Sequence, residues 1–129
     1  MVRKFQLIGI TYAGLSVILG AFGAHALKVV LSIDQINTFE TGVKYQFLHG
    51  LALLVLSLFV TQNTSSKWLQ RAGILMTIGV VLFSGSIYVL ATRSLFPFTV
   101  GNWIGPITPL GGLCFILGWI SWAIAIVRG

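Results

Sequence analysis

Four long runs of apolar residues, separated by short polar segments, dominate the chain. The pattern predicts membrane-spanning helices over about residues 5–24, 43–60, 72–91 and 107–127. Each run is close to the ~20 apolar residues that a helix needs to cross the hydrocarbon of a bilayer. We therefore expect an all-α polytopic membrane protein in which residues 1–129 form a single antiparallel bundle of four transmembrane helices.

The segment between the first and second runs is amphipathic. Ser32 to Gln35 has the form of a capping box, in which a serine and a glutamine three residues later satisfy each other's backbone N–H groups. Apolar residues then recur at helical spacing up to the second run. The sequence predicts a helix that begins after Ser32, follows the membrane surface, and continues into the span that ends near Val60.

Small residues recur in a heptad pattern in both the first and the last run. Association of helices in lipid gains little from the hydrophobic effect, so small side chains that let backbones approach closely favour contact. Because both runs carry such a stripe, we expect the first and last helices to touch and close the bundle. The helix-packing residues predicted on this basis are Gly9, Ala13, Ser16, Gly20, Gly23, Gly111, Cys114, Gly118 and Ser121.

The composition supports a membrane location. Hydrophobic residues make up 57% of the chain and charged residues 8%, whereas a typical soluble domain has about 25% charged residues. The net charge of +6 does not indicate nucleic-acid binding, because the basic residues stand singly or in pairs at the ends of apolar runs. Five of the eight fall on the side that holds both chain ends, so the positive-inside rule predicts cytoplasmic termini.

Polar side chains gather in the half of the predicted bundle opposite the termini, the outer half. At about 100° per residue, Gln46 and His49 share one face of the second helix, whereas Glu40 and Lys44 lie on the opposite face. Polar groups within membrane helices usually face other helices, so the first pair should point inward. The predicted polar pocket comprises His25, Tyr45, Gln46, His49, Ser84 and Tyr88.

Two histidines offer few routes to chemistry. A zinc site needs three or four ligands, and the nearest carboxylate, Glu40, lies on the wrong face. Two histidines suffice in number to ligate a haem, but the bulky aromatic residues nearby leave no evident room. Proton transfer and simple hydrogen bonding between helices remain as alternatives. We therefore expect no cofactor and no metal, and favour a protein without enzymatic activity.

Four blocks of the sequence resemble a known family. They are Gly20–Lys28, Phe39–His49, Phe83–Tyr88 and Thr108–Trp119, and in this order they resemble the YgdD/YwdK-like small multi-pass membrane proteins of bacteria. The resemblance implies an inner-membrane protein with four spans. The family is one of unknown function, so it implies no catalytic residue.

These observations predict a non-enzymatic membrane protein that binds lipid or a partner protein through the polar pocket. The alternative is a small transporter or channel subunit, which requires oligomers because four short helices enclose little pore. An enzyme or redox protein ranks third. The expected partners are membrane lipids and either another protein or further copies of this chain, and not nucleic acid.

Overall fold

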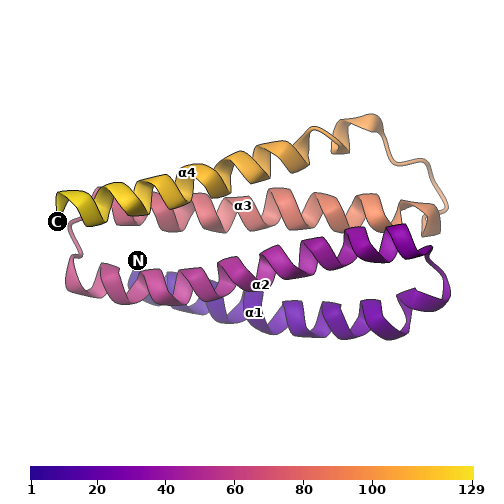
Figure 1. The fold of residues 1–129 in the computed structure, drawn as a ribbon, viewed down its shortest axis with the longest axis horizontal. Helices are drawn as coiled ribbons and strands as arrows, with labels where there is room; N and C mark the ends of the chain where they lie inside the picture. Colours follow the sequence, from indigo (N-terminus) through magenta and orange to yellow (C-terminus); the bar gives the residue numbers. More distant parts are fainter.

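The computed structural model describes residues 1–129 and consists of four long helices joined by short connections (Figure 1). All four are long and apolar enough to cross a membrane, which confirms the predicted all-α, four-span architecture. Both termini lie at the same end as the α2–α3 connection (Figure 1). The helices are α1 (Val2–His25), α2 (Ile33–Gln62), α3 (Lys67–Thr92) and α4 (Ile107–Arg128), with single 3₁₀ turns η1 (Leu27–Val29), η2 (Arg93–Leu95) and η3 (Asn102–Ile104) between them.

Helix α2 begins with the capping box that the sequence predicts. The Ser32 hydroxyl accepts a hydrogen bond from the backbone N–H of Gln35 at 3.2 Å, and the Gln35 side-chain oxygen accepts one from the N–H of Ser32 at 2.9 Å. The Gln35 amide also donates to the hydroxyl of Ser94 at 3.0 Å, which ties the start of α2 to η2. The amphipathic segment forms the first turns of a continuous 30-residue helix.

The helices pack in chain order. Helix α1 packs on α2, α2 on α3, and α3 on α4. Figure 1 shows α1 and α4 on opposite sides of the central α2–α3 pair. The expectation that the first and last helices touch is therefore wrong. Each of them forms a hairpin with its neighbour in the chain, and that neighbour already occupies its small-residue face.

Glycines mark the places where paired helices come closest. A Cβ on Gly9 would lie 2.7 Å from the carbonyl oxygen of Gly50, and a Cβ on Gly50 would lie 2.9 Å from the backbone nitrogen of Ala13. In the other hairpin, a Cβ on Gly111 would lie 2.3 Å from the backbone nitrogen of Phe83. Side chains at these positions would push backbones apart, so close approach in lipid depends on their absence.

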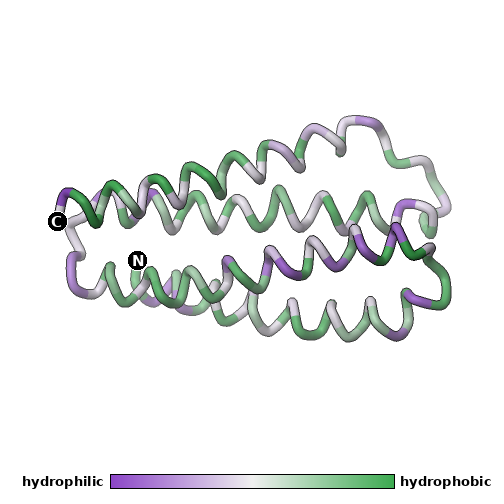
Figure 2. Tube along the Cα trace, in the orientation of Figure 1, coloured by the Kyte–Doolittle hydropathy of each residue, from purple (hydrophilic) through white to green (hydrophobic).

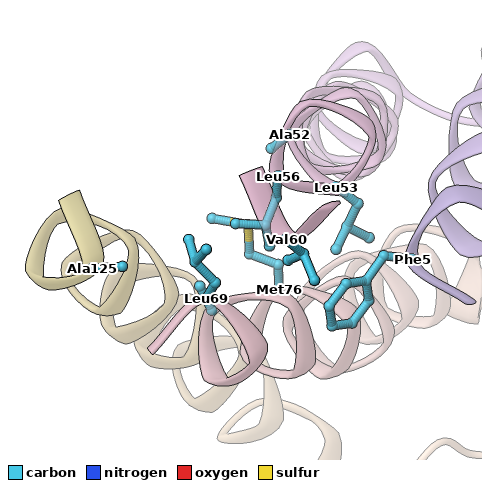
Figure 3. Close-up of a cluster of buried hydrophobic side chains, with 9 residues drawn as sticks. Phe5, Ala52, Leu53, Leu56, Val60, Leu69, Met76 and Ala125 are labelled. Atoms are coloured by element: carbon cyan, nitrogen blue, oxygen red, sulfur yellow. The ribbon is translucent and has the colours of Figure 1, made fainter. Parts of the chain in front are cut away.

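The apolar core is concentrated toward the end that holds the termini. Met76 of α3 and Leu53 and Leu56 of α2 are fully buried there, and α1 contributes the ring of Phe5 (Figure 3). A smaller cluster of Leu27, Leu31, Phe39 and Ala91 closes the opposite end. Between the two clusters, polar side chains enter the interior.

Candidate functional site

Gln46 is the centre of a buried polar network that joins three helices. Its side chain is 4% exposed, and its amide donates to the carbonyl oxygen of Tyr12 in α1 at 2.9 Å. The amide oxygen accepts a hydrogen bond from the Tyr88 hydroxyl of α3 at 2.6 Å. The Tyr12 hydroxyl in turn donates to the carbonyl oxygen of Thr77 at 2.9 Å. Both polar ends of the glutamine are thus satisfied, as a buried amide requires.

Two serines of α3 extend this network along the helix. The Ser84 hydroxyl donates to the carbonyl oxygen of Gly42 at 2.7 Å. Gly42 allows this approach, because a Cβ there would lie 2.8 Å from the ring of Tyr88. The Ser86 hydroxyl meets that of Thr108 at 2.5 Å and links α3 to the start of α4.

His49 uses both of its ring nitrogens. The indole N–H of Trp119 donates to Nε2 at 3.1 Å, and Nδ1 lies 2.9 Å from the carbonyl oxygen of Tyr45. An indole nitrogen can only donate and a carbonyl can only accept. Nε2 is therefore unprotonated and Nδ1 carries the proton, so His49 is a neutral imidazole in the Nδ1–H tautomer. The Phe115 ring stacks on it with centroids 3.6 Å apart.

Aromatic side chains from α2 and α4 meet above α3. Tyr45 stacks near Phe115 at 6.2 Å, and His49 meets Trp119 edge-on at 5.8 Å. In each pair the two residues are 70 positions apart in the sequence, and such a constant offset is expected when two helices run parallel and in register. Phe83 of α3 packs beneath them, 4.8 Å from Tyr45 and 5.4 Å from Phe115. These rings fill the space between two helices that do not pack backbone to backbone.

The structure brings five of the six predicted pocket residues into this region. Gln46, His49 and Ser84 are buried, whereas Tyr45 and Tyr88 are partly exposed. His25 is not part of it, because it is exposed at the end of α1. Gln46 and His49 lie on either side of the midpoint of the 30-residue α2. Every buried polar side-chain atom has a hydrogen-bond partner within the chain.

Sequence reasoning missed Tyr12 and Trp119, which complete the network. Each reaches a residue at least 65 positions away, and no local pattern indicates that contact. Phe115 was missed as well, although its spacing of four residues from Trp119 matches that of Tyr45 and His49. The arrangement holds the four helices together. Both ring nitrogens of His49 already take part in hydrogen bonds, so neither is free for other chemistry.

A second site lies at the end that holds the termini. The guanidinium carbons of Arg71 and Arg128 lie 4.9 Å and 5.5 Å from the centre of the Trp68 ring. Trp68 and Arg128 also line a groove of about 380 Å³ between α3 and α4, whose other walls are apolar. Cation–π contact holds both arginines against the indole, next to a strip of apolar surface.

Comparison with known proteins identifies the family. The family described as "Protein of unknown function (DUF423)" matches residues 19–112. The chain belongs to the DUF423 family. Its match includes the α2 and α3 parts of the polar network, whereas Tyr12 and Trp119 lie outside the matched residues.

Relatives in the DUF423 family match nearly the whole chain. The chain is 37% identical to the UPF0382 membrane protein YwdK of Bacillus subtilis, covering 98% of each. It is 40% identical to a UPF0382 membrane protein of Staphylococcus haemolyticus, covering 98% of this chain and 97% of the relative. It is 35% identical to the UPF0382 inner membrane protein YgdD of Escherichia coli K12, covering 99% and 93%. No solved structure matches. The resemblance seen in the sequence is confirmed, and the protein is a multi-pass membrane protein.

Proposed function

We propose that this DUF423 protein is a non-enzymatic membrane protein that binds anionic phospholipid at the end that holds its termini. Lipid binding was expected at the polar pocket. The buried polar side chains there are hydrogen-bonded within the chain, so a lipid headgroup would have to displace those bonds. The arginines at the other end are free of such partners.

The observation that carries the proposal is the pair of guanidinium groups against Trp68. Guanidinium forks bind phosphate oxygens through two parallel hydrogen bonds. Arg71 and Arg128 both lie against the indole of Trp68, 4.9 Å and 5.5 Å from its centre, so two guanidinium groups are held close to one residue at this end. Both carboxylate side chains of the chain, Asp34 and Glu40, belong to the first turns of α2 at the opposite end and do not compete.

Apolar grooves next to the basic residues suit acyl chains. Ile120, Ile124 and Val127 line the groove that begins at Trp68 and Arg128. A second groove of about 310 Å³ lies on the α1 side, where Phe5 and Ile74 contribute apolar walls beside Lys4. Basic side chains at the end of a transmembrane bundle with apolar surface beneath them match the two parts of a phospholipid.

The charge distribution supports the cytoplasmic leaflet as the source of this lipid. Five of the eight basic residues lie at this end, which the positive-inside rule assigns to the cytoplasm. That leaflet carries the negative surface potential that attracts basic segments. An anionic diacyl phospholipid is therefore the proposed ligand, and a protein partner at this end is the competing outcome of the test.

The test measures lipid retention in bilayer nanodiscs of phosphatidylcholine with a minor fraction of phosphatidylglycerol. Native mass spectrometry of the released protein should show phosphatidylglycerol enriched over its bulk fraction. The double variant Arg71→Gln/Arg128→Gln should lose roughly 25-fold in affinity, from about 1 kcal/mol for each basic residue.

A matched control removes the same charge at the opposite end. Lys28→Gln/Arg93→Gln should retain phosphatidylglycerol as the parent does, because neither residue lies near Trp68. Equal losses in the two double variants would mean that net charge alone attracts the lipid, and the proposed site would be abandoned. Retention of both lipids in proportion to their bulk fractions in the parent protein would also refute it.

A further inference from the structure

The free side of α2 carries an exposed stripe with a strict heptad spacing. Its members alternate in steps of three and four residues, and each has an exposed side chain. The stripe, here called the α2 seam, consists of Asp34, Asn37, Thr41, Lys44, Leu48, Leu51, Val55 and Leu58. It is polar in its first half and apolar in its second, and Figure 2 shows the change from hydrophilic to hydrophobic along α2. A spacing of this kind is typical of helices that pair in a left-handed supercoil.

Contacts with α1 show how deep in the membrane the polar half of the α2 seam lies. A Cβ on Gly23 would lie 3.0 Å from the ring of Phe39, and one on Gly20 would lie 3.4 Å from Val43. Phe39 is thus level with the last turn of the apolar run in α1. Lys44 follows five residues later, about 7.5 Å further along the axis at 1.5 Å per residue. The polar half therefore extends below the outer rim of the apolar helices.

The neighbouring helix shows lipid-compatible side chains at the same depth. On α1, Ile18 is 64% exposed and Phe22 is 51% exposed. On α2, Thr41 and Lys44 face outward at this depth, although polar residues within a membrane normally face protein or water. The Thr41 hydroxyl donates to the carbonyl oxygen of Asn37 in its own helix, but Asn37 and Lys44 have no hydrogen-bond partner for their side chains within the chain. This face is incomplete in a single copy.

We propose that the α2 seam is the contact between two copies of this chain, which form a symmetric dimer with α2 packed against α2. A two-fold axis along the membrane normal makes the two helices parallel and brings equal depths together. Polar residues then face polar residues, and Leu48 and Leu51 face their own counterparts. An Asn in such a seam also fixes the register of the two helices.

Charge complementarity favours a second copy over an unrelated partner. Glu40 flanks the seam one turn before Lys44, about 6 Å along the axis. In a parallel pair, each Lys44 side chain can extend toward the outer rim and reach the Glu40 of the other copy. Each copy thus supplies one acid and one base, so the same Lys44–Glu40 pair can form twice across the two-fold axis. The transporter or channel alternative also requires oligomers, and a seam shared between copies would provide the contact between them.

Cysteine cross-linking in native membranes tests the contact. The single cysteine, Cys114 on α4, is first replaced (Cys114→Ala). Thr41→Cys and Leu51→Cys in this background should give disulfide-linked dimers on mild oxidation. Ile18→Cys on α1 and Val81→Cys on α3, both exposed and away from the seam, should give severalfold less. Equal yields at all four positions, or dimers at neither seam position, would overturn the proposal.

Charge reversal tests the same contact by an independent measurement. Glu40→Lys removes the acidic partner of Lys44 and places a second lysine one turn from it, so the dimer fraction counted by single-molecule photobleaching in bilayers should fall severalfold. The double variant Glu40→Lys/Lys44→Glu restores opposite charges and should recover the dimer. Both residues are exposed, so thermal unfolding of the variants should match the parent. A double variant that dimerises no better than Glu40→Lys, or a parent that is monomeric, would contradict the proposal.

Discussion

The indole N–H of Trp119 donates a hydrogen bond to Nε2 of His49 across 3.1 Å and joins two helices that do not pack backbone to backbone. Because the indole can only donate, the imidazole must present a bare nitrogen on that side. Phe115 covers one face of the imidazole, so little space is left for an outside ligand. In this structure His49 is a connector between α2 and α4.

A double-mutant cycle should measure this connection. His49→Leu leaves the Trp119 N–H without its acceptor, and Trp119→Phe leaves Nε2 without its donor. We expect each single change to destabilise the fold modestly, and a coupling energy of about 1 kcal/mol, within the range found for interhelical hydrogen bonds in membranes. Unfolding in mixed micelles, followed by circular dichroism, provides the free energies.

Trp103→Phe is the control for loss of an indole, because Trp103 is 67% exposed in the connection before α4. It should leave the free energy of unfolding unchanged. If the costs of His49→Leu and Trp119→Phe simply add in the double variant, the hydrogen bond contributes nothing to stability and His49 must be explained in another way.

The Gln46 network predicts an order of costs among three substitutions. Gln46→Leu removes the acceptor of Tyr88 and one donor to the carbonyl of Tyr12, and should cost about 1–2 kcal/mol. Tyr88→Phe removes only one hydrogen bond and should cost less. Tyr45→Phe should be neutral, because the Tyr45 hydroxyl is not part of the network and the side chain is 37% exposed. Thermal unfolding of the three variants in one detergent checks the order, and a neutral Gln46→Leu would show that the network is dispensable.

Features set by neighbouring residues were predictable from the sequence. The capping box at Ser32 and Gln35 depends only on residues three apart, and it forms as predicted. The division of α2 into a buried face with Gln46 and His49 and an exposed face with Glu40 and Lys44 follows from helical periodicity alone. The four spans follow from the lengths of their apolar runs.

Contacts between distant residues were not predictable in the same way. A stripe of small residues indicates that a helix packs closely, but it does not name the partner. Gly111 faces the backbone of Phe83, and a contact with backbone atoms leaves no pattern in the amino-acid sequence. Tyr12 and Trp119 reach residues 65 and 70 positions away, and nothing local indicates either pairing.

The glycine contacts predict which substitutions separate the helices. Gly50→Ile and Gly111→Ile would drive a side chain into the backbone of the facing helix, and should cost at least the 1–3 kcal/mol or so that overpacking costs in a tight core. Gly20→Ile should cost less, because the nearest atom to its Cβ is the Val43 side chain at 3.4 Å. Thermal unfolding in one detergent should rank the variants in this order.

Gly14→Ile is the matched control on α1. No atom lies within 4 Å of a Cβ at Gly14, so a large side chain there extends outward. It should unfold at the temperature of the parent protein. An equal loss of stability in Gly14→Ile and Gly50→Ile would mean that β-branching or the loss of glycine, and not helix separation, is responsible.

The distribution of basic residues predicts an orientation that reporter fusions can test. The structure places both termini at one end (Figure 1), with Arg3, Lys4, Lys67, Arg71 and Arg128. A fluorescent-protein fusion at the C-terminus should be bright if that end is cytoplasmic, and an alkaline phosphatase fusion there should be inactive. Alkaline phosphatase inserted at Thr99, in the connection at the opposite end, should be active.

The bias behind this orientation is small enough to be removed. Five basic residues lie at the terminal end and three at the other, so Arg3→Gln/Lys4→Gln leaves three on each side. Because the imbalance of basic residues next to the spans sets the orientation, this variant should insert in both directions, with both C-terminal reporters partly active. Lys28→Gln/Arg93→Gln widens the bias and should keep the original orientation. A charge-balanced variant that still inserts in one direction would show that the apolar runs or the connections, and not the basic residues, determine the topology.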